Sequence, residues 1–319
     1  MNKTYGTIFM GTSEFAVPIL KTLATSASLK KAHVEIVEVI TTPDTKSGRG
    51  LKLTPPPVKI EAEKLGLKII QPQTLIEKEL PKADLIILAA YGKILPSWLI
   101  KLPTKGALNI HPSLLPKLRG ATPIQTAILE GWEQTGASLF VMDEKIDHGP
   151  VIAQVNCPTA ENETYTSLEK KLAELGAKLL EESLPNWLEG NITAKTQDDS
   201  QATQTRLIKK QDGKIDWSKS AKEIERQIRA FEQWPGSYCV WRMTDDKELT
   251  LKITKANPLY QHIKSTHDTG KIMYVNGKIG VVTGDGILML ERVQPAGKKE
   301  MSIEEFARGH KNFINSSLN

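Results

Sequence analysis

Asn109 and His111 are the residues whose types and spacing suggest chemistry most clearly. They lie two apart in the apolar stretch 107–111, and Pro112 predicts that a strand ends at His111. Alternate side chains of a strand share a face, so both should project together at its end. An amide donor beside an imidazole suits acyl transfer, in which an oxygen gains negative charge. The structural alternative is a strand-end asparagine beside a histidine that binds only backbone.

Two further segments extend this pair into a longer ordered pattern. Residues 113–116 read Ser-Leu-Leu-Pro and lead into Lys-Leu-Arg-Gly at 117–120, and an acidic segment follows at 142–150. This order resembles the signature of the formyltransferases that use 10-formyltetrahydrofolate. The resemblance implies transfer of a formyl group from that folate and makes Asp147 the third member of the catalytic group.

The resemblance also implies a role for each residue of the pattern. Asn109 and His111 would stabilise the oxyanion of a tetrahedral intermediate, and Asp147 would support His111 and proton transfer. A wall of the folate pocket would be formed by Ser113, Leu114, Leu115 and Pro116. Ser113 itself is not expected to be a nucleophile, because no Gly-x-Ser-x-Gly pattern surrounds it.

Metal chemistry and disulfide bonds are not expected. His111, Asp147 and His148 make a poor ligand set, because structural and catalytic sites need several ligands at close spacing. Cys157 and Cys239 are the only cysteines and lie far apart. This usage is typical of a reducing cytoplasm.

The elements around the pattern predict an α/β domain with a Rossmann-like, mostly parallel sheet. A strand, a turn, a helix and a second strand follow one another from Thr7 to Ile40, an order that favours parallel crossover connections. The apolar run 83–90 suits a central strand buried on both faces. Strands at 136–142 and 151–155 should bracket Asp147, and residues 166–189 should form a long amphipathic helix.

The C-terminal part predicts a smaller β-rich domain. Residues 190–208 are polar and have the composition of a linker. Beyond them, a helix at 221–231 precedes several short strands, with a tight-turn signal at Asn276-Gly277. We therefore expect a catalytic domain at 1–189, a linker at 190–208 and an OB-like barrel at 209–319, a fold that often binds nucleic acids.

Charge is distributed unevenly along the 319 residues, whose net charge is +5. Residues 1–208 carry 23 Lys and Arg against 23 Asp and Glu, whereas residues 209–319 carry 19 against 14. A basic surplus confined to one domain suits a polyanion such as RNA. The turn-rich loop 41–55 is also basic, and the resemblance makes Lys46, Arg49 and Lys52 candidate tRNA contacts; a merely solvated loop is the alternative.

Further motifs extend the resemblance over nearly the whole chain. Those at 9–12, 90–92, 215–218 and 294–298 are similar to the bacterial methionyl-tRNA formyltransferases. This implies a monomeric cytoplasmic enzyme, with no membrane association, that formylates initiator methionyl-tRNA. One alternative is a formyltransferase acting on a nucleotide-sugar amine or on glycinamide ribonucleotide. The other is a non-catalytic RNA-binding protein on an inactive scaffold. The basic loop and barrel favour tRNA, and the intact catalytic group argues against inactivity.

Overall fold

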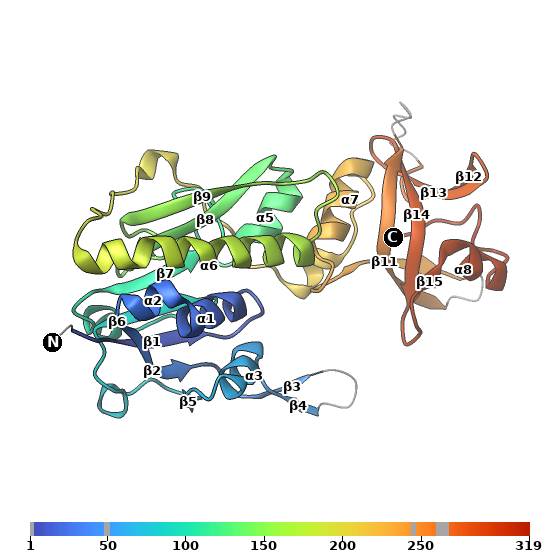
Figure 1. Cartoon of the computed structure of the whole chain (residues 1–319). Helices are drawn as coiled ribbons and strands as arrows, with labels where there is room; N and C mark the ends of the chain where they lie inside the picture. Colours follow the sequence, from blue (N-terminus) through green and yellow to red (C-terminus); the bar gives the residue numbers. More distant parts are fainter. Residues whose placement is uncertain (1–2, 48–51, 244–246, 260–267) are drawn as a thin grey trace. The chain divides into compact units, whose positions relative to one another are not determined.

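A computed structural model describes residues 3–47, 52–243, 247–259 and 268–319 of the protein (Figure 1). The chain packs into two compact units. Unit 1 comprises Met1–Pro123, Glu133–Thr159 and Leu168–Thr205. Unit 2 comprises Ile124–Trp132, Ala160–Ser167 and Arg206–Asn319.

Unit 1 is built on a seven-stranded sheet in the order β5-β2-β1-β6-β7-β8-β9. The first five strands are parallel, β8 is antiparallel to β7, and β9 is antiparallel to β8. The strands are β1 (Tyr5–Gly11), β2 (Val34–Ile40), β5 (Ile69–Ile70), β6 (Leu85–Ala89), β7 (Ala107–His111), β8 (Gln134–Val141) and β9 (Val151–Pro158). The Rossmann-like, mostly parallel sheet predicted from the sequence is confirmed.

The helices of unit 1 fix which way the site residues point. They are α1 (Ala16–Thr25), α2 (Ala27–Lys31), α3 (Pro57–Lys64), α4 (Ser97–Lys101) and α6 (Tyr165–Glu189), the last beginning in unit 2. A Cβ added at Gly176 of α6 would lie 2.8 Å from the Ile110 side chain and 3.8 Å from that of Ile19 in α1. Helices α1 and α6 therefore cover the Ile110 face of the sheet (Figure 1). Since side chains alternate, Asn109 and His111 point to the opposite face.

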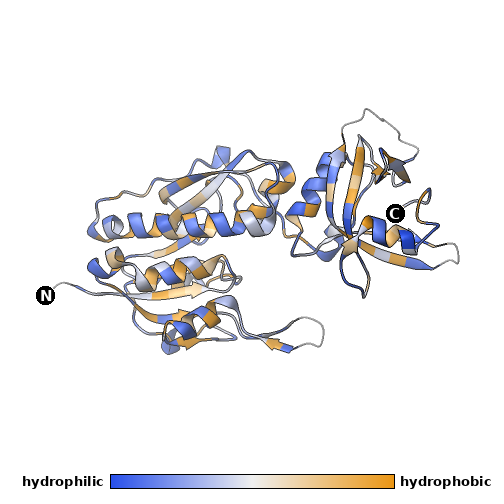
Figure 2. Ribbon diagram, turned by 45° about the vertical axis from the view of Figure 1, so that its right-hand side comes forward, coloured by the Kyte–Doolittle hydropathy of each residue, from blue (hydrophilic) through white to orange (hydrophobic). Residues whose placement is uncertain are grey.

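That opposite face is closed by an apolar cluster beside the site. Ala107, on the same side of β7 as Asn109 and His111, packs in a buried cluster with Leu99 of α4 and Tyr91. Hydrophobic and hydrophilic residues alternate along α6, as expected of a helix lying on a sheet (Figure 2). The polar pair thus belongs to a strand that is buried along its whole length.

The segment 41–55 is not the strandless loop that the sequence suggested. It contains β3 (Thr45–Ser47) and β4 (Lys52–Thr54), which pair as an antiparallel hairpin. Threonine on both arms favours strand pairing over open coil. The base is fixed by Asp44, which accepts hydrogen bonds from Gln71 Nε2 at 2.6 Å and Lys59 Nζ at 2.9 Å. These bonds hold the pKa of the Asp44 carboxyl below its usual range.

Unit 2 contains the predicted OB-like barrel. Its strands are β10 (Ser237–Arg242), β11 (Glu248–Leu259), β12 (Ile272–Val275), β13 (Lys278–Val282), β14 (Ile287–Pro295) and β15 (Met301–Ser302). They pair in the order β10-β11-β14-β13-β12, with β15 on β14. The C-terminus joins the two sheet edges, because Asn319 bonds Val240 of β10 and Leu318 bonds Gly270 just before β12. Asn276 and Gly277 both have positive φ in the β12–β13 turn, as predicted.

The helices of unit 2 are α5 (Pro123–Glu130), α7 (Ala221–Ala230) and α8 (Ile303–Gly309). Helix α7 begins with a capping box between Ser220 and Glu223. Helix α8 and strand β12 were not predicted from the sequence. No helix within the described residues is both long and apolar enough to cross a membrane.

Candidate active site

Asn109 and His111 lie at the carboxyl end of β7 with 8% and 4% of their surfaces exposed. Asn109 Oδ1 is buried and has no hydrogen-bond partner among the described residues. An unpaired buried amide oxygen is unfavourable in an ordinary core, where such atoms are almost always bonded. The amide is therefore available for a bound group.

The two ring nitrogens of His111 face different partners. Nε2 lies 2.9 Å from the carbonyl oxygen of Leu118. Because a carbonyl can only accept, Nε2 carries the hydrogen. Nδ1 lies 3.5 Å from Asp147 Oδ2. This distance exceeds that of a direct hydrogen bond, which leaves Nδ1 able to approach a third atom.

Asp147 lies in the connection between β8 and β9, as expected from the sequence. Its Oδ2 accepts a 2.8 Å hydrogen bond from the backbone N–H of Gly120. Its backbone is left-handed, with φ of 48°, a conformation that aspartate tolerates better than most residues. The structure thus brings Asp147, in the loop after β8, close to His111 on β7.

Glycine is required two residues after Asp147. A Cβ added at Gly149 would lie 1.8 Å from the carbonyl oxygen of Val141, too close for any side chain. Gly149→Ala should therefore displace the loop. We expect it to lower the free energy of unfolding by about 1–3 kcal/mol, as at other overpacked sites, and to lower kcat as well. Thermal unfolding and steady-state kinetics measure the two effects. Gly309→Ala is the matched control, since a Cβ there meets nothing within 4 Å; equal melting temperatures for both variants would contradict the prediction.

The turn 113–116 is ordered by hydrogen bonds of its own. Ser113 is fully buried, and its hydroxyl donates to the carbonyl oxygen of Lys117 at 2.6 Å. The Leu115 N–H donates to Ser138 Oγ at 3.0 Å, and the Leu115 carbonyl accepts from Gln154 at 2.9 Å. Leu114 and Pro116 remain partly exposed. The turn can therefore offer apolar surface, whereas the Ser113 hydroxyl serves the turn itself.

Other reactive side chains are engaged elsewhere or buried. His148 turns its ring nitrogens to Asp143 Oδ2 at 2.6 Å and Asp199 Oδ2 at 3.4 Å. Both cysteines are buried and no disulfide joins them, and burial raises the pKa of the Cys239 thiol to about 12. Within the described ranges, no group of three or more His, Cys, Asp or Glu is arranged to hold a metal ion.

The candidate tRNA contacts lie on the β3–β4 hairpin. Lys46 and Lys52 are exposed and lie on opposite strands, Lys46 opposite Leu53 and Ser47 opposite Lys52. Arg49 lies outside the residues that the structure describes. The hairpin therefore presents two lysines to solvent.

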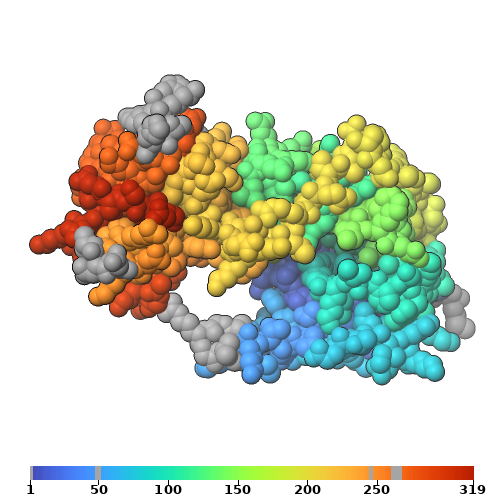
Figure 3. All heavy atoms as spheres, turned by 180° about the vertical axis from the view of Figure 1, so that it is seen from behind, coloured from blue at the N-terminus to red at the C-terminus, as the bar shows by residue number. Residues whose placement is uncertain are grey.

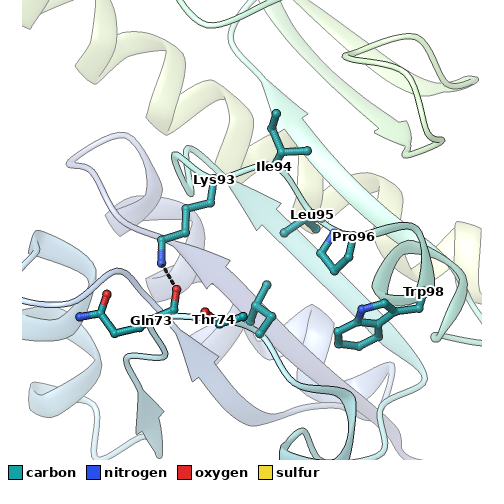
Figure 4. Close-up of a pocket in the computed structure, with 8 residues that line it drawn as sticks. Gln73, Thr74, Lys93, Ile94, Leu95, Pro96 and Trp98 are labelled. Atoms are coloured by element: carbon teal, nitrogen blue, oxygen red, sulfur yellow. Dashed lines mark hydrogen bonds between the residues drawn. The ribbon is translucent and has the colours of Figure 1, made fainter.

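A separate pocket of about 370 Å³ lies in unit 1 (Figure 4). It is lined by Gln73, Thr74, Leu75, Lys93, Ile94, Leu95, Pro96 and Trp98. Lys93 Nζ closes part of it by donating to the carbonyl oxygen of Gln73 at 3.1 Å. None of the site residues predicted from the sequence lines this pocket.

Two site neighbours were not singled out from the sequence. Arg119 is 4% exposed and bonds Gln197, which in turn bonds the backbone beside Asp147. Arg119 belongs to the Lys-Leu-Arg-Gly motif at 117–120, so the sequence pattern could have identified it. Gln197 lies in a polar stretch that gave no signal, because its role depends on a contact distant in sequence.

Comparison with known proteins decides the family. A model described as formyl transferase matches residues 7–184, and one described as formyl transferase, C-terminal domain, matches residues 207–311. The chain belongs to the formyl transferase family. Within the family it is 40% identical to a methionyl-tRNA formyltransferase of Listeria monocytogenes over 95% of both chains. It is 39% identical to that of Bacillus pumilus over 95% of this chain and 94% of the relative.

Solved structures share the fold at lower sequence identity. An N-formyltransferase from Helicobacter canadensis, crystallised with folinic acid and dTDP-3-aminofucose, gives a TM-score of 0.64 at 19% identity. That match covers 94% of this chain and all of the other. HypX from Aquifex aeolicus with tetrahydrofolic acid gives 0.61 at 17%, covering 99% of this chain and 49% of the other.

Proposed function

We propose that this formyl transferase moves the formyl group of 10-formyltetrahydrofolate to the α-amine of initiator methionyl-tRNA, supplying formyl-Met-tRNA for translation initiation. The observation that carries the proposal is the match to methionyl-tRNA formyltransferases at about 40% identity over 95% of the chain. The approach of Asp147 to His111, with Asn109 on the same face of β7, supports this chemistry.

The reaction is a direct transfer. A bond forms between the amine nitrogen and the formyl carbon, the bond from that carbon to N10 of the folate breaks, the amine loses a proton and N10 gains one. Asn109 donates from its amide nitrogen Nδ2 and His111, in its imidazolium form, donates from Nδ1 to the carbonyl oxygen while it is negative; Nε2 of His111 already donates to the Leu118 carbonyl. Asp147 supports His111 and accepts the proton of the amine, directly or through water.

The turn 113–116 forms one wall of the folate site in this proposal. Leu114 and Pro116 supply partly exposed apolar surface for a flat ring, while Ser113 and Leu115 hold the turn through the bonds described above. The turn directly follows His111, so a ring bound against it lies next to the catalytic pair. Residues 1–189 thus carry the chemistry; this division of the chain stays a prediction.

Residues 209–319 and the β3–β4 hairpin bind the tRNA in this proposal. Their excess of Lys and Arg should make binding weaken as salt rises, because each phosphate contact releases counterions. We further propose that the enzyme acts in the cytoplasm, because translation initiation occurs there. We also propose that it is a monomer. Light scattering of the purified protein tests the monomer.

Reversing the charges of the hairpin lysines should weaken the binding of tRNA and leave the binding of the folate unchanged. The double variant Lys46→Glu/Lys52→Glu is expected to raise KM for tRNA by about an order of magnitude at low salt, with KM for the folate unchanged. A matched control, Lys21→Glu/Lys30→Glu, makes the same charge change at exposed positions of α1 and α2. If both doubles have the same KM for tRNA, the hairpin lysines do not bind it.

The function is tested by following labelled formyl from 10-formyltetrahydrofolate to three acceptors. The acceptors are initiator methionyl-tRNA, a nucleotide-sugar amine and glycinamide ribonucleotide. We expect rapid transfer to methionyl-tRNA and little to the others. Transfer only to a small acceptor would assign the site to that substrate. Binding of tRNA without transfer to any acceptor would make the protein a non-catalytic RNA-binding protein.

A further inference from the structure

The segment 195–205, whose composition suggested a linker, packs against the loop that carries Asp147. We propose that Gln197 and Arg119 are positioning residues that hold Asp147 beside His111. This inference rests on the proposed role of Asp147 in catalysis. All the residues involved belong to unit 1, and the outer side of the segment is part of the surface (Figure 3, yellow).

Gln197 fixes the backbone on both sides of His148. Its Nε2 donates to the carbonyl oxygen of Asp147 at 3.0 Å and to that of Gly149 at 2.7 Å. Asp147 is left-handed, with φ of 48°. Such a conformation in a residue other than glycine is strained and persists only where the surroundings impose it. The two bonds from Gln197 are placed to impose it.

Arg119 fixes Gln197 in turn. The guanidinium is buried and donates from Nε and Nη2 to Gln197 Oε1, at 3.0 and 2.8 Å. Because arginine only donates, Oε1 must face it, and this turns the amide nitrogen toward the two carbonyls. Nη2 also donates to Asp199 Oδ1 at 2.8 Å. That hydrogen bond holds the pKa of the Asp199 carboxyl below its usual range, so the carboxyl is ionised at neutral pH.

The backbone around Arg119 links the same segment to both catalytic residues. The Leu118 carbonyl accepts from His111 Nε2, and the Gly120 N–H donates to Asp147 Oδ2. Between them, the Arg119 N–H donates to the Thr203 carbonyl at 2.9 Å, and its carbonyl accepts from the Thr205 N–H at 2.7 Å. The turn 118–120 is therefore paired on one side with the segment and on the other with the catalytic pair.

Close approach at this turn depends on a glycine. Gly120 has φ of 113°, and a Cβ added there would lie 2.7 Å from Thr205 Oγ1. At the other end of the segment, Lys195 forms a backbone bridge with Val151 at the start of β9. The segment is thus attached on both sides of Gln197. Since Nδ1 and Oδ2 are already 3.5 Å apart, a further displacement of Asp147 would separate the pair.

Gln197→Met removes both hydrogen-bonding functions and keeps the side-chain length. We expect kcat to fall by about 10- to 100-fold, the effect of misplacing a catalytic group by about 1 Å. KM for the folate and for methionyl-tRNA should change by less than about 2-fold, since Gln197 touches neither in this account. Gln201→Met, an exposed glutamine in the same segment, is the matched control and should keep wild-type kcat.

A double-mutant cycle separates positioning from general structural support. If Gln197 acts through Asp147, Gln197→Met should cause no further loss of kcat in the Asp147→Asn background. The inference would be overturned if the effects of Gln197→Met and Asp147→Asn on the activation free energy were fully additive. Wild-type kcat in a folded Gln197→Met variant would overturn it as well. Should Gln197→Met unfold, Gln197→Glu keeps the acceptor for Arg119 but loses both donors, and takes its place in the cycle. Wild-type kcat in Asp147→Asn itself would mean that the proposed role of Asp147 fails, and the inference with it.

Discussion

Asn109→Ala is expected to lower kcat by about 10²–10³-fold, the loss seen when one oxyanion donor is removed. The buried amide oxygen of Asn109 has no hydrogen-bond partner among the described residues, so removing it costs the fold no hydrogen bond there. Stability should therefore change far less than activity. His111→Ala should lower kcat at least as much, because the imidazole faces both Asp147 and the Leu118 carbonyl.

The two substitutions differ in their structural effect. His111→Ala leaves the Leu118 carbonyl without its partner, so this variant should also lose some stability, about 1–3 kcal/mol. Asn156→Ala, at an exposed position of β9, is the matched control for Asn109→Ala. Steady-state kinetics for both substrates, with thermal unfolding, separate the effects. A value of kcat for Asn109→Ala near that of the control would remove Asn109 from the mechanism.

Asp147→Asn should also lower kcat by about 10²–10³-fold, within the range for loss of a general base. Asparagine has the same shape, and its oxygen can still accept the hydrogen bond from the Gly120 N–H. The substitution therefore removes the negative charge beside His111 and the acceptor for the proton of the amine. KM for both substrates should change little, because the loss is confined to the chemical step.

A control for Asp147→Asn lies in the same loop. Asp143→Asn removes an equal charge from a carboxyl that contacts His148 rather than His111. It should retain most of the activity. Equal losses in the two variants would indicate a general dependence on the negative charge of the loop, and would contradict a specific role for Asp147.

The sequence predicted most of what depends on local pattern. The spacing of Asn109 and His111, followed by Pro112, placed both on one face at the end of a strand, as the structure has them. The apolar run that became β6 was also predicted to be a buried central strand. In each case, residues close in sequence determine the element. The partnership of Asp147 with His111 came from family resemblance, because no local pattern reports a contact between distant residues.

Other features were missed for physical reasons. The polar stretch around Gln197 has few apolar residues, so composition gave it no place in a core. It is nevertheless ordered by backbone and amide hydrogen bonds to Asp147 and Arg119. The β3–β4 hairpin was missed because its strands have only three residues each. Leu118 contributes a backbone carbonyl to His111, which any residue type can provide.

The central claim is that Asn109, His111 and Asp147 carry out formyl transfer to methionyl-tRNA. The most direct test is the single-turnover rate of labelled formyl transfer, with enzyme in excess over initiator methionyl-tRNA and the folate saturating. We expect fast transfer by the wild type. Asn109→Ala, His111→Ala and Asp147→Asn should each transfer the formyl group more slowly by about 10²-fold or more and should bind both substrates normally. Single-turnover rates within a few-fold of wild type for all three variants would contradict it.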